Sequence, residues 1–181
     1  MKPPYDYRWD QGRKWALQLY KDNGPLLDVG CGRRPCHSRA VTVDAYRGPD
    51  GGYPSEIIDP HFYQSYMDLP FKDNTFTQVV SIDSVEHTED PVAAIDEWLR
   101  VLKPGGYLSL LVPDHMFTPQ IDDHPVEWTL ESFRKGPIDT ILDAYDIIGS
   151  DGSGPVYIRK SELVENWWAG FILQKFYPGI S

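Results

Sequence analysis

The segment LLDVGCG, residues 26–32, restricts the fold of this 181-residue chain more than any other feature. A short apolar run ends in Asp28, and Gly30 and Gly32 follow it one residue apart. Glycine tolerates positive φ angles and lets the backbone approach a ligand closely. The pattern is therefore typical of a buried strand whose chain enters a ligand-contacting turn.

The stretch after this turn is short. The residues RRPCHSRA, which include Pro35, separate Gly32 from the next apolar run. A crossover between parallel strands usually takes about a dozen residues or more, most often with a helix. The sequence therefore predicts a shortened first crossover with little room for a helix.

The rest of the chain alternates apolar runs with helix-like stretches. Strands are expected at 25–30, 40–44, within 64–69, 76–83, 107–114, 138–149 and 171–178. Helices are expected at 10–22, at 91–102 and, as a short one, at 129–136. The helix at 91–102 is the clearest, because Asp90 can cap its first turn and Pro91 suits the first helical position. This alternation predicts an α/β fold with a doubly wound, mostly parallel sheet, in which the last two strands form an antiparallel edge.

The composition fits one globular domain without a broad basic surface. The chain is long enough to bury a core, and its formal net charge of −10 weighs against long nucleic acids and anionic membranes as partners. The sequence contains no run of about 18 apolar residues, so no membrane span is expected. Two cysteines, Cys31 and Cys36, are too few for a disulfide framework or a zinc site, which favours a reducing, cytoplasmic location and no bound metal.

Acidic residues end the first two predicted strands, at Asp28 and Asp44. In a sheet of this class, ligands bind outside the carboxyl ends of the strands, where the strand order reverses. An acid after the second strand can accept hydrogen bonds from ribose hydroxyls, either of a dinucleotide or of S-adenosylmethionine. A dinucleotide site needs a third glycine, because the pyrophosphate lies on the next helix N-terminus. Here the pattern reads Gly30, Gly32 and then Pro35, so a nicotinamide-dependent oxidoreductase is the less favoured alternative.

Five segments carry a resemblance to a known family. They are LLDVGCG (26–32), VTVD (41–44), MDLPF (67–71), VVSIDSVEHTEDP (79–91) and EWLRVLKPGGYLSLLVPD (97–114). In this order they resemble the motifs of the class I S-adenosylmethionine-dependent methyltransferases, which implies S-adenosylmethionine as the cofactor. The resemblance divides a single domain into an N-terminal helical segment (1–23), a cofactor-binding half (24–115) and a substrate-side half (116–181).

The resemblance also implies which residues form the site. In it, Asp28 meets the ammonium group of the cofactor, Asp44 meets the ribose, and Asp68 faces the adenine amino group. The full set implied to bind the cofactor is Asp28, Gly30, Cys31, Gly32, Asp44, Ala45, Asp68, Leu69, Ile82 and Asp83. His87 follows the strand that faces the transferred methyl group; it is either a general base towards the acceptor or a residue that shapes the pocket.

The expected reaction is methyl transfer to a small-molecule or sugar-type acceptor, by in-line attack on the sulfonium methyl group. A larger glycan or protein acceptor remains an alternative. Ser81–Ser84 reads SIDS where family members that methylate nucleobase amines have a proline-rich motif, so such acceptors are disfavoured. The missing third glycine leaves a second hypothesis open, a methyltransferase-like protein that binds the cofactor without turnover. A metal at Asp114, His115, His124 and Glu127 is not expected.

Overall fold

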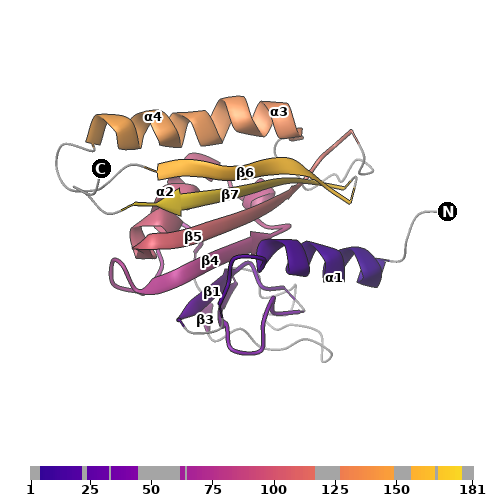
Figure 1. Cartoon of the computed structure of the whole chain (residues 1–181), viewed down its shortest axis with the longest axis horizontal. Coiled ribbons are helices and arrows are strands. Elements are labelled where there is room, and N and C mark those ends of the chain that lie inside the picture. The colour runs from indigo at the N-terminus through magenta and orange to yellow at the C-terminus, as the bar shows by residue number, and fades with distance from the viewer. Residues whose placement is uncertain are drawn as a thin grey trace.

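The computed structural model describes residues 5–21, 24–32, 34–44, 62–63, 65–116, 127–148, 156–165 and 167–176. Its strands form one seven-stranded sheet in the order β3-β2-β1-β4-β5-β7-β6 (Figure 1). The strands are β1 (Leu26–Val29), β2 (Val41–Asp44), β3 (Phe62–Tyr63), β4 (Phe76–Ile82), β5 (Leu102–Pro113), β6 (Val156–Val164) and β7 (Trp168–Lys175). The helices are α1 (Tyr5–Ala16), α2 (Pro91–Val101), α3 (Leu130–Phe133) and α4 (Asp139–Ile148), with the short segments η1 (Val85–His87) and η2 (Arg134–Ile138).

The sheet is parallel from β3 to β5, and the strands after that are antiparallel. β1 pairs in parallel with β2 and β4, and β4 pairs in parallel with β5. β7 lies between β5 and β6 and runs antiparallel to both. The predicted doubly wound, mostly parallel sheet with an antiparallel edge is confirmed. The strand order reverses between β1 and β4, which is the position where sheets of this class bind ligands.

One face of the sheet carries the larger core. Trp98 and Leu99 of α2 are buried there with Phe133 of α3 and Ile141 of α4, and Figure 1 shows α3 and α4 running along β6 and β7. The indole of Trp98 donates a hydrogen bond of 2.9 Å to the Tyr66 carbonyl. These helices therefore bury the apolar sheet face and also hold the loop that follows β3.

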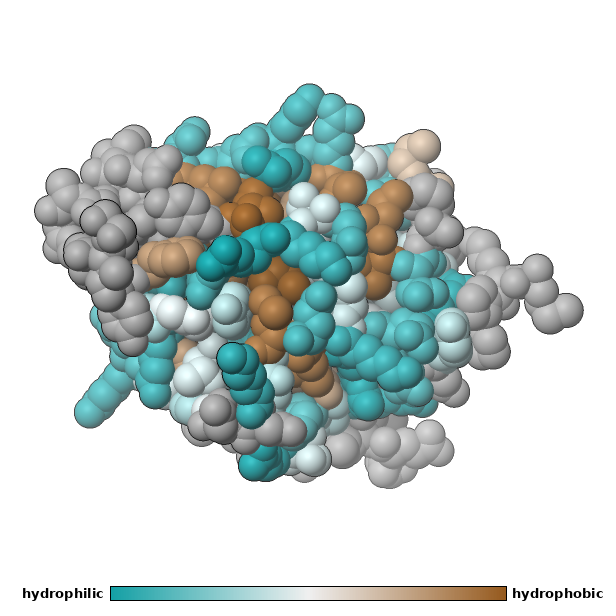
Figure 2. All heavy atoms as spheres, in the orientation of Figure 1, coloured by the Kyte–Doolittle hydropathy of each residue, from teal (hydrophilic) through white to brown (hydrophobic). Residues whose placement is uncertain are grey.

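The opposite face is covered by α1 and by the first crossover. Trp9 and Ala16 of α1 are buried against Ile82 and Trp168. At Gly12, an added Cβ would lie 3.1 Å from the Trp168 ring, a tight contact, so the glycine allows close packing of α1 on β7. The described residues of the crossover form turns and bends without a helix, which confirms the shortened first connection. In the same orientation, Figure 2 shows hydrophobic residues across the middle of the molecule with hydrophilic residues around them.

A buried lysine ties the end of β7 to the end of α2. The Lys175 ammonium donates hydrogen bonds to the carbonyls of Leu99 (2.9 Å) and Leu102 (3.1 Å). Leu99 lies in the last turn of α2 and Leu102 directly follows it, where the carbonyls lack intrahelical donors. The ammonium also donates to Asn74 Oδ1 at 3.1 Å. Burial lowers the pKa of Lys175, and these three acceptors offset part of the cost of burying the cation.

The prediction of a strand at 138–149 is wrong, because that segment forms α4. Ile138 and Ile141 are buried and Leu142 is partly buried against the same core. Their spacing of three and four residues matches one face of a helix. The several isoleucines of this segment favour a strand when the local sequence is considered alone. The helix forms because it buries these side chains against the core.

Three further boundaries differ from expectation. β6 was not predicted, since its sequence carries Arg159, Lys160 and Glu162 on an edge strand whose register shifts between Ile158 and Lys160. The helix expected at 10–22 lies at Tyr5–Ala16. The short strand expected within 64–69 is a turn, and β3 precedes it. There the Leu69 N–H donates to Glu97 (2.7 Å) of α2 rather than to a neighbouring strand.

Candidate cofactor-binding site

The glycine turn after β1 is fastened to the end of β2. The Gly30 N–H donates to the Val43 carbonyl at 2.8 Å, and the Gly32 N–H donates to the Asp44 carboxylate at 2.8 Å. The second oxygen of Asp44 accepts a hydrogen bond from the Tyr66 hydroxyl at 3.3 Å. Asp44 is only 3% exposed. The turn, the acid at the end of β2 and the loop after β3 therefore meet at one point.

The two glycines of this turn answer different constraints. Both have positive φ, +72° at Gly30 and +52° at Gly32. A Cβ on Gly30 would lie 2.2 Å from Cβ of Ser84, so the backbone there passes directly against the chain that follows β4. A Cβ on Gly32 would meet no atom of the described residues within 4 Å. Among those residues, the space in front of Gly32 is therefore open and bordered by the Asp44 carboxylate.

Asp28 is a buried acid beneath this turn. It is 3% exposed, and one of its oxygens accepts the Cys36 N–H at 2.6 Å. Burial raises the pKa of Asp28 to about 7, although the hydrogen bond from Cys36 opposes the rise. The carboxyl group thus changes charge near neutral pH, and a cation beside it would favour the ionised form.

The two cysteines beside Asp28 are inert thiols. Both are buried and neither forms a disulfide. Burial raises the pKa of Cys31 to about 12 and raises that of Cys36 as well. Because the thiolate is the nucleophilic form, neither side chain is suited to covalent chemistry at neutral pH.

The end of β4 forms the opposite wall of the site. The Ser84 hydroxyl donates to the Val29 carbonyl at 3.1 Å and lies 2.5 Å from the Ser81 hydroxyl. Asp83 has a positive φ of +50°, and the indole of Trp168 donates a hydrogen bond to its carboxylate. Burial raises the pKa of Asp83 to about 7. β7 thereby fixes the direction of an acid at the carboxyl end of β4.

Beyond Asp83 the chain enters η1, which carries Glu86 and His87. Glu86 is buried, whereas 39% of the His87 side chain is exposed. His87 Nε2 lies 3.9 Å from a Glu86 carboxylate oxygen. The imidazole is therefore accessible from solvent on the side of the sheet where the site lies.

The remaining predicted residues are less closely grouped. Leu69 is buried and Asp68 is exposed in the segment between β3 and β4. The Ile82 side chain packs in the core under α1, so that any contact with a ligand would come from its backbone. Ala45 lies outside the described residues.

Sequence reasoning missed several residues of this region. Tyr66 lies two positions before Asp68, and this closeness to a motif was the available signal. Trp168 lies far from the motifs in sequence and was expected to pack on a sheet face, so its hydrogen bond to Asp83 had no local signal. Arg8 of α1 is buried, with its guanidinium 4.0 Å from the centroid of the Trp167 ring. The start of β7 therefore connects α1 with the end of β4.

The described ranges contain no group of three or more His, Cys, Asp or Glu side chains arranged to hold a metal ion. Asp114 instead accepts backbone N–H groups from Met116 (3.0 Å) and Leu130 (2.8 Å), and His124 lies outside the described ranges. Within those ranges, no helix has the length and apolar character needed to cross a membrane.

Comparisons with known proteins agree with this arrangement. Residues 49–110 match a family model described as a methyltransferase domain. The chain is 31% identical over 100 residues to the 27-O-demethylrifamycin SV methyltransferase of Amycolatopsis mediterranei, which covers 47% of this chain and 37% of that protein. The chain spans less than half the length of the curated relatives it matches.

Two solved structures share the fold. A chain of the complex between the Haloferax volcanii Trm112 methyltransferase activator and a methyltransferase aligns with a TM-score of 0.65 at 16% identity, covering 95% of this chain and 92% of that one. The cyclase SpnF aligns with a TM-score of 0.62 at 18% identity, covering 93% and 82%.

The strand order and the acid-bordered glycine turn define a Rossmann-like fold, which the solved structures share. The matched methyltransferase domain over residues 49–110 and the methyltransferase relatives support a class I S-adenosylmethionine-dependent methyltransferase, a class whose cofactor is S-adenosylmethionine.

Proposed function

We propose that this chain transfers the methyl group of S-adenosylmethionine to a small-molecule or sugar-type acceptor. The observation that carries the proposal is the open space in front of Gly32, bordered by the buried Asp44 carboxylate. A relative named for a small-molecule substrate, 27-O-demethylrifamycin SV, supports that acceptor class. The net charge of −10 weighs against a nucleic-acid acceptor.

The residues of the turn fit the parts of this cofactor. The Asp44 carboxylate accepts hydrogen bonds from the ribose hydroxyls. The oxygen that does so is the one that accepts the Tyr66 hydroxyl in this structure. Asp28 faces the ammonium group, which favours its ionised form. Gly32 leaves room for the ligand beside the backbone. Ala45, Asp68 and Leu69 complete the site on the adenine side.

When bound, S-adenosylmethionine supplies a methyl group already activated by the sulfonium charge. The protein mainly needs to hold the acceptor in line, and positioning alone can contribute about 7–11 kcal/mol at best. His87 is the candidate base if the acceptor is a hydroxyl or an ammonium group, since its side chain is 39% exposed on the side of the site. Asp83 borders the same end of β4.

The alternative function is cofactor binding without methyl transfer. Arg33 replaces the third glycine of the family motif, and the first crossover has no helix in its described part. A neighbour in fold, SpnF, is named as a cyclase. Binding of S-adenosylhomocysteine without turnover on any acceptor would favour this alternative.

The test combines cofactor identification with a site variant. Mass spectrometry of the purified protein should find carried-over S-adenosylmethionine or S-adenosylhomocysteine, and calorimetry should show S-adenosylhomocysteine binding while NAD does not bind. Asp44→Asn should weaken that binding by about 1.5–3 kcal/mol, the scale of hydrogen bonds to a charged group. Asp139→Asn, on α4, is the matched control and should bind as the wild type does.

An acceptor screen that detects S-adenosylhomocysteine release then tests turnover. Binding of NAD in place of S-adenosylhomocysteine would refute the proposal.

A further inference from the structure

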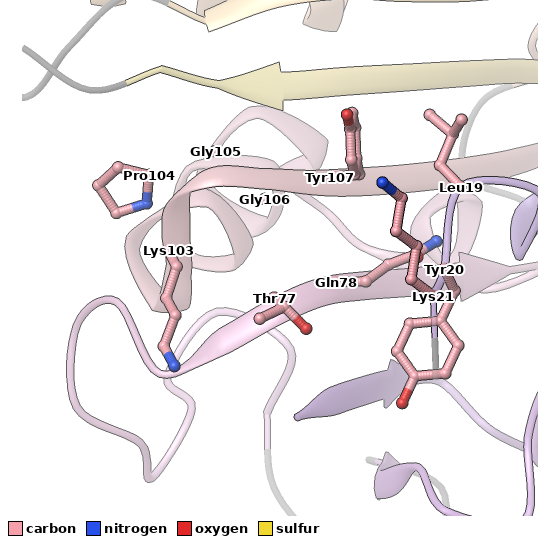
Figure 3. Close-up of a pocket in the computed structure, with 10 residues that line it drawn as sticks. All are labelled: Leu19, Tyr20, Lys21, Thr77, Gln78, Lys103, Pro104, Gly105, Gly106 and Tyr107. Atoms are coloured by element: carbon pink, nitrogen blue, oxygen red, sulfur yellow. The ribbon is translucent and has the colours of Figure 1, made fainter. Parts of the chain in front are cut away.

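A second hollow lies at the other end of the sheet from the glycine turn (Figure 3). Its volume is about 390 Å³, and residues 19–21, 77–78 and 103–107 line it. These are the segment after α1 and the amino ends of β4 and β5. Six residues of strand separate Thr77 from Asp83, which at about 3.3 Å per residue puts the hollow roughly 20 Å from the cofactor end of β4. The volume is that of a small-molecule site, which typically spans about 300–1,000 Å³.

Two lysines give the hollow a positive charge in an acidic protein. Lys21 is exposed and Lys103 is partly buried. Within the described ranges, neither ammonium group has an ion pair or a hydrogen bond. Figure 3 shows Thr77 and Gln78 between the two lysines, with the Lys21 side chain extending toward Tyr107. Two cations that have no partner among the described residues and lie at one hollow suit an anion as the occupant.

Gln78, one of the residues that line the hollow, carries a buried acceptor that lacks a donor among the described residues. Gln78 is 1% exposed, and its amide nitrogen donates to the Ala16 carbonyl (2.7 Å) and the Ser109 hydroxyl (3.1 Å). These two bonds fix the orientation of the amide. Its oxygen is buried without a hydrogen-bond partner in the described chain. Buried polar groups nearly always have a partner, and a hydroxyl on a bound ligand, or a water held by it, would supply the donor.

We propose that this hollow binds a small organic anion, a carboxylate or a phosphate ester, that also carries a hydroxyl group. Lys21 and Lys103 bind the anionic group or groups, and the hydroxyl supplies the hydrogen bond that Gln78 lacks. The rings of Tyr20 and Tyr107 form the sides. The site is independent of the cofactor, because it lies at the amino ends of the strands whose carboxyl ends carry Asp28 and Asp83.

The test is a titration of the full chain followed by two-dimensional NMR of the backbone amides. The probes are L-malate for the carboxylate, glycerol 3-phosphate for the phosphate ester, and glycerol as the uncharged control. We expect L-malate or glycerol 3-phosphate to bind and to shift amides of residues 77–78 and 103–107, while glycerol does not bind. The stronger of the two anions identifies the source of the charge. Succinate, which lacks the hydroxyl of L-malate, should bind less tightly than L-malate.

A charge-matched pair of double variants decides whether the lysines are responsible. Lys21→Gln with Lys103→Gln should weaken binding of the better anion by about tenfold or more, on the scale of one charged hydrogen bond. Lys14→Gln with Lys135→Gln removes the same charge elsewhere and should leave the affinity unchanged. Thermal unfolding checks that both pairs fold. Equal loss in the two double variants, no binding of either anion at millimolar concentration, or shifts confined to the glycine turn would each overturn the proposal.

Discussion

The two glycines of the first turn allow a quantitative prediction, because alanine at each meets a different environment. A residue with a Cβ in a left-handed conformation costs about 1–2 kcal/mol, and this applies at both positions. At Gly30 the new methyl carbon would also lie 2.2 Å from Ser84 Cβ, and Ser84 is held by hydrogen bonds to Val29 and Ser81. Overpacking of this kind adds about 1–3 kcal/mol. We expect Gly30→Ala to lower the free energy of unfolding by about 2–5 kcal/mol, and Gly32→Ala by about 1–2 kcal/mol.

Denaturant unfolding measures these losses, and a second substitution separates their causes. Ser84→Gly removes the atom that the Gly30→Ala methyl group overlaps, so the double variant should recover the overpacking part of the loss. Gly32→Ala should fold and yet bind S-adenosylhomocysteine more weakly, since its methyl group enters the open space in front of the turn. Equal losses at the two glycines, or no recovery with Ser84→Gly, would show that the close approach to β4 does not determine the choice of glycine.

Three further predictions concern titratable groups and their partners. Burial raises the pKa of Asp28 from its ordinary value of 3.8 to about 7, so its stabilising effect is complete below about pH 4 and is lost as pH rises to 7, a change of up to about 4 kcal/mol. Asp28→Asn should flatten the pH dependence of denaturant unfolding over this range, and an unchanged slope would exclude the assignment. If His87 is a general base, His87→Ala should slow the chemical step in single-turnover assays by about 10²–10⁴ and leave cofactor affinity unchanged, whereas a loss of only a few fold would mean that it shapes the pocket. The hydrogen bond from Trp168 lowers the pKa of Asp83 against the effect of burial, so Trp168→Phe should raise that pKa further in a carboxyl-carbon NMR titration, and a fall would contradict the contact.

The parts of the fold that local sequence determines were predictable. Asp28 and Asp44 end short apolar runs, and parallel strands bring such ends to one edge of the sheet, so their meeting followed from the sequence pattern. The segment 138–149 was not predictable in the same way, because its isoleucines suit a strand and a helix equally until the core they face is known. The edge strand β6 carries charges that hide its alternation, as edge strands often do.

The candidate site likewise has features that the local sequence predicts and features that depend on residues distant in the sequence. The glycine turn was expected to contact a ligand, and the structure adds that Gly30 is required by Ser84, a residue from another strand end. The contact between Trp168 and Asp83 joins positions 85 residues apart. No pattern within one segment could indicate this contact. It depends on the strand order, in which β5 separates β7 from β4.

The place of β7 in the sheet has a consequence for the order in which the chain is built. β5 pairs with β7 and not with β6, although β6 is synthesised first. During translation the edge of β5 that pairs with β7 therefore stays unpaired until residues 168–175 have been synthesised. The hydrogen bond from Lys175 to the Leu99 carbonyl at the end of α2 also forms only then. Such distant pairings slow folding, and unpaired strand edges expose nascent chains to aggregation. We expect ribosome-bound chains shorter than this to be sensitive to proteolysis, and the cofactor end of β4 to become ordered only when Trp168 arrives.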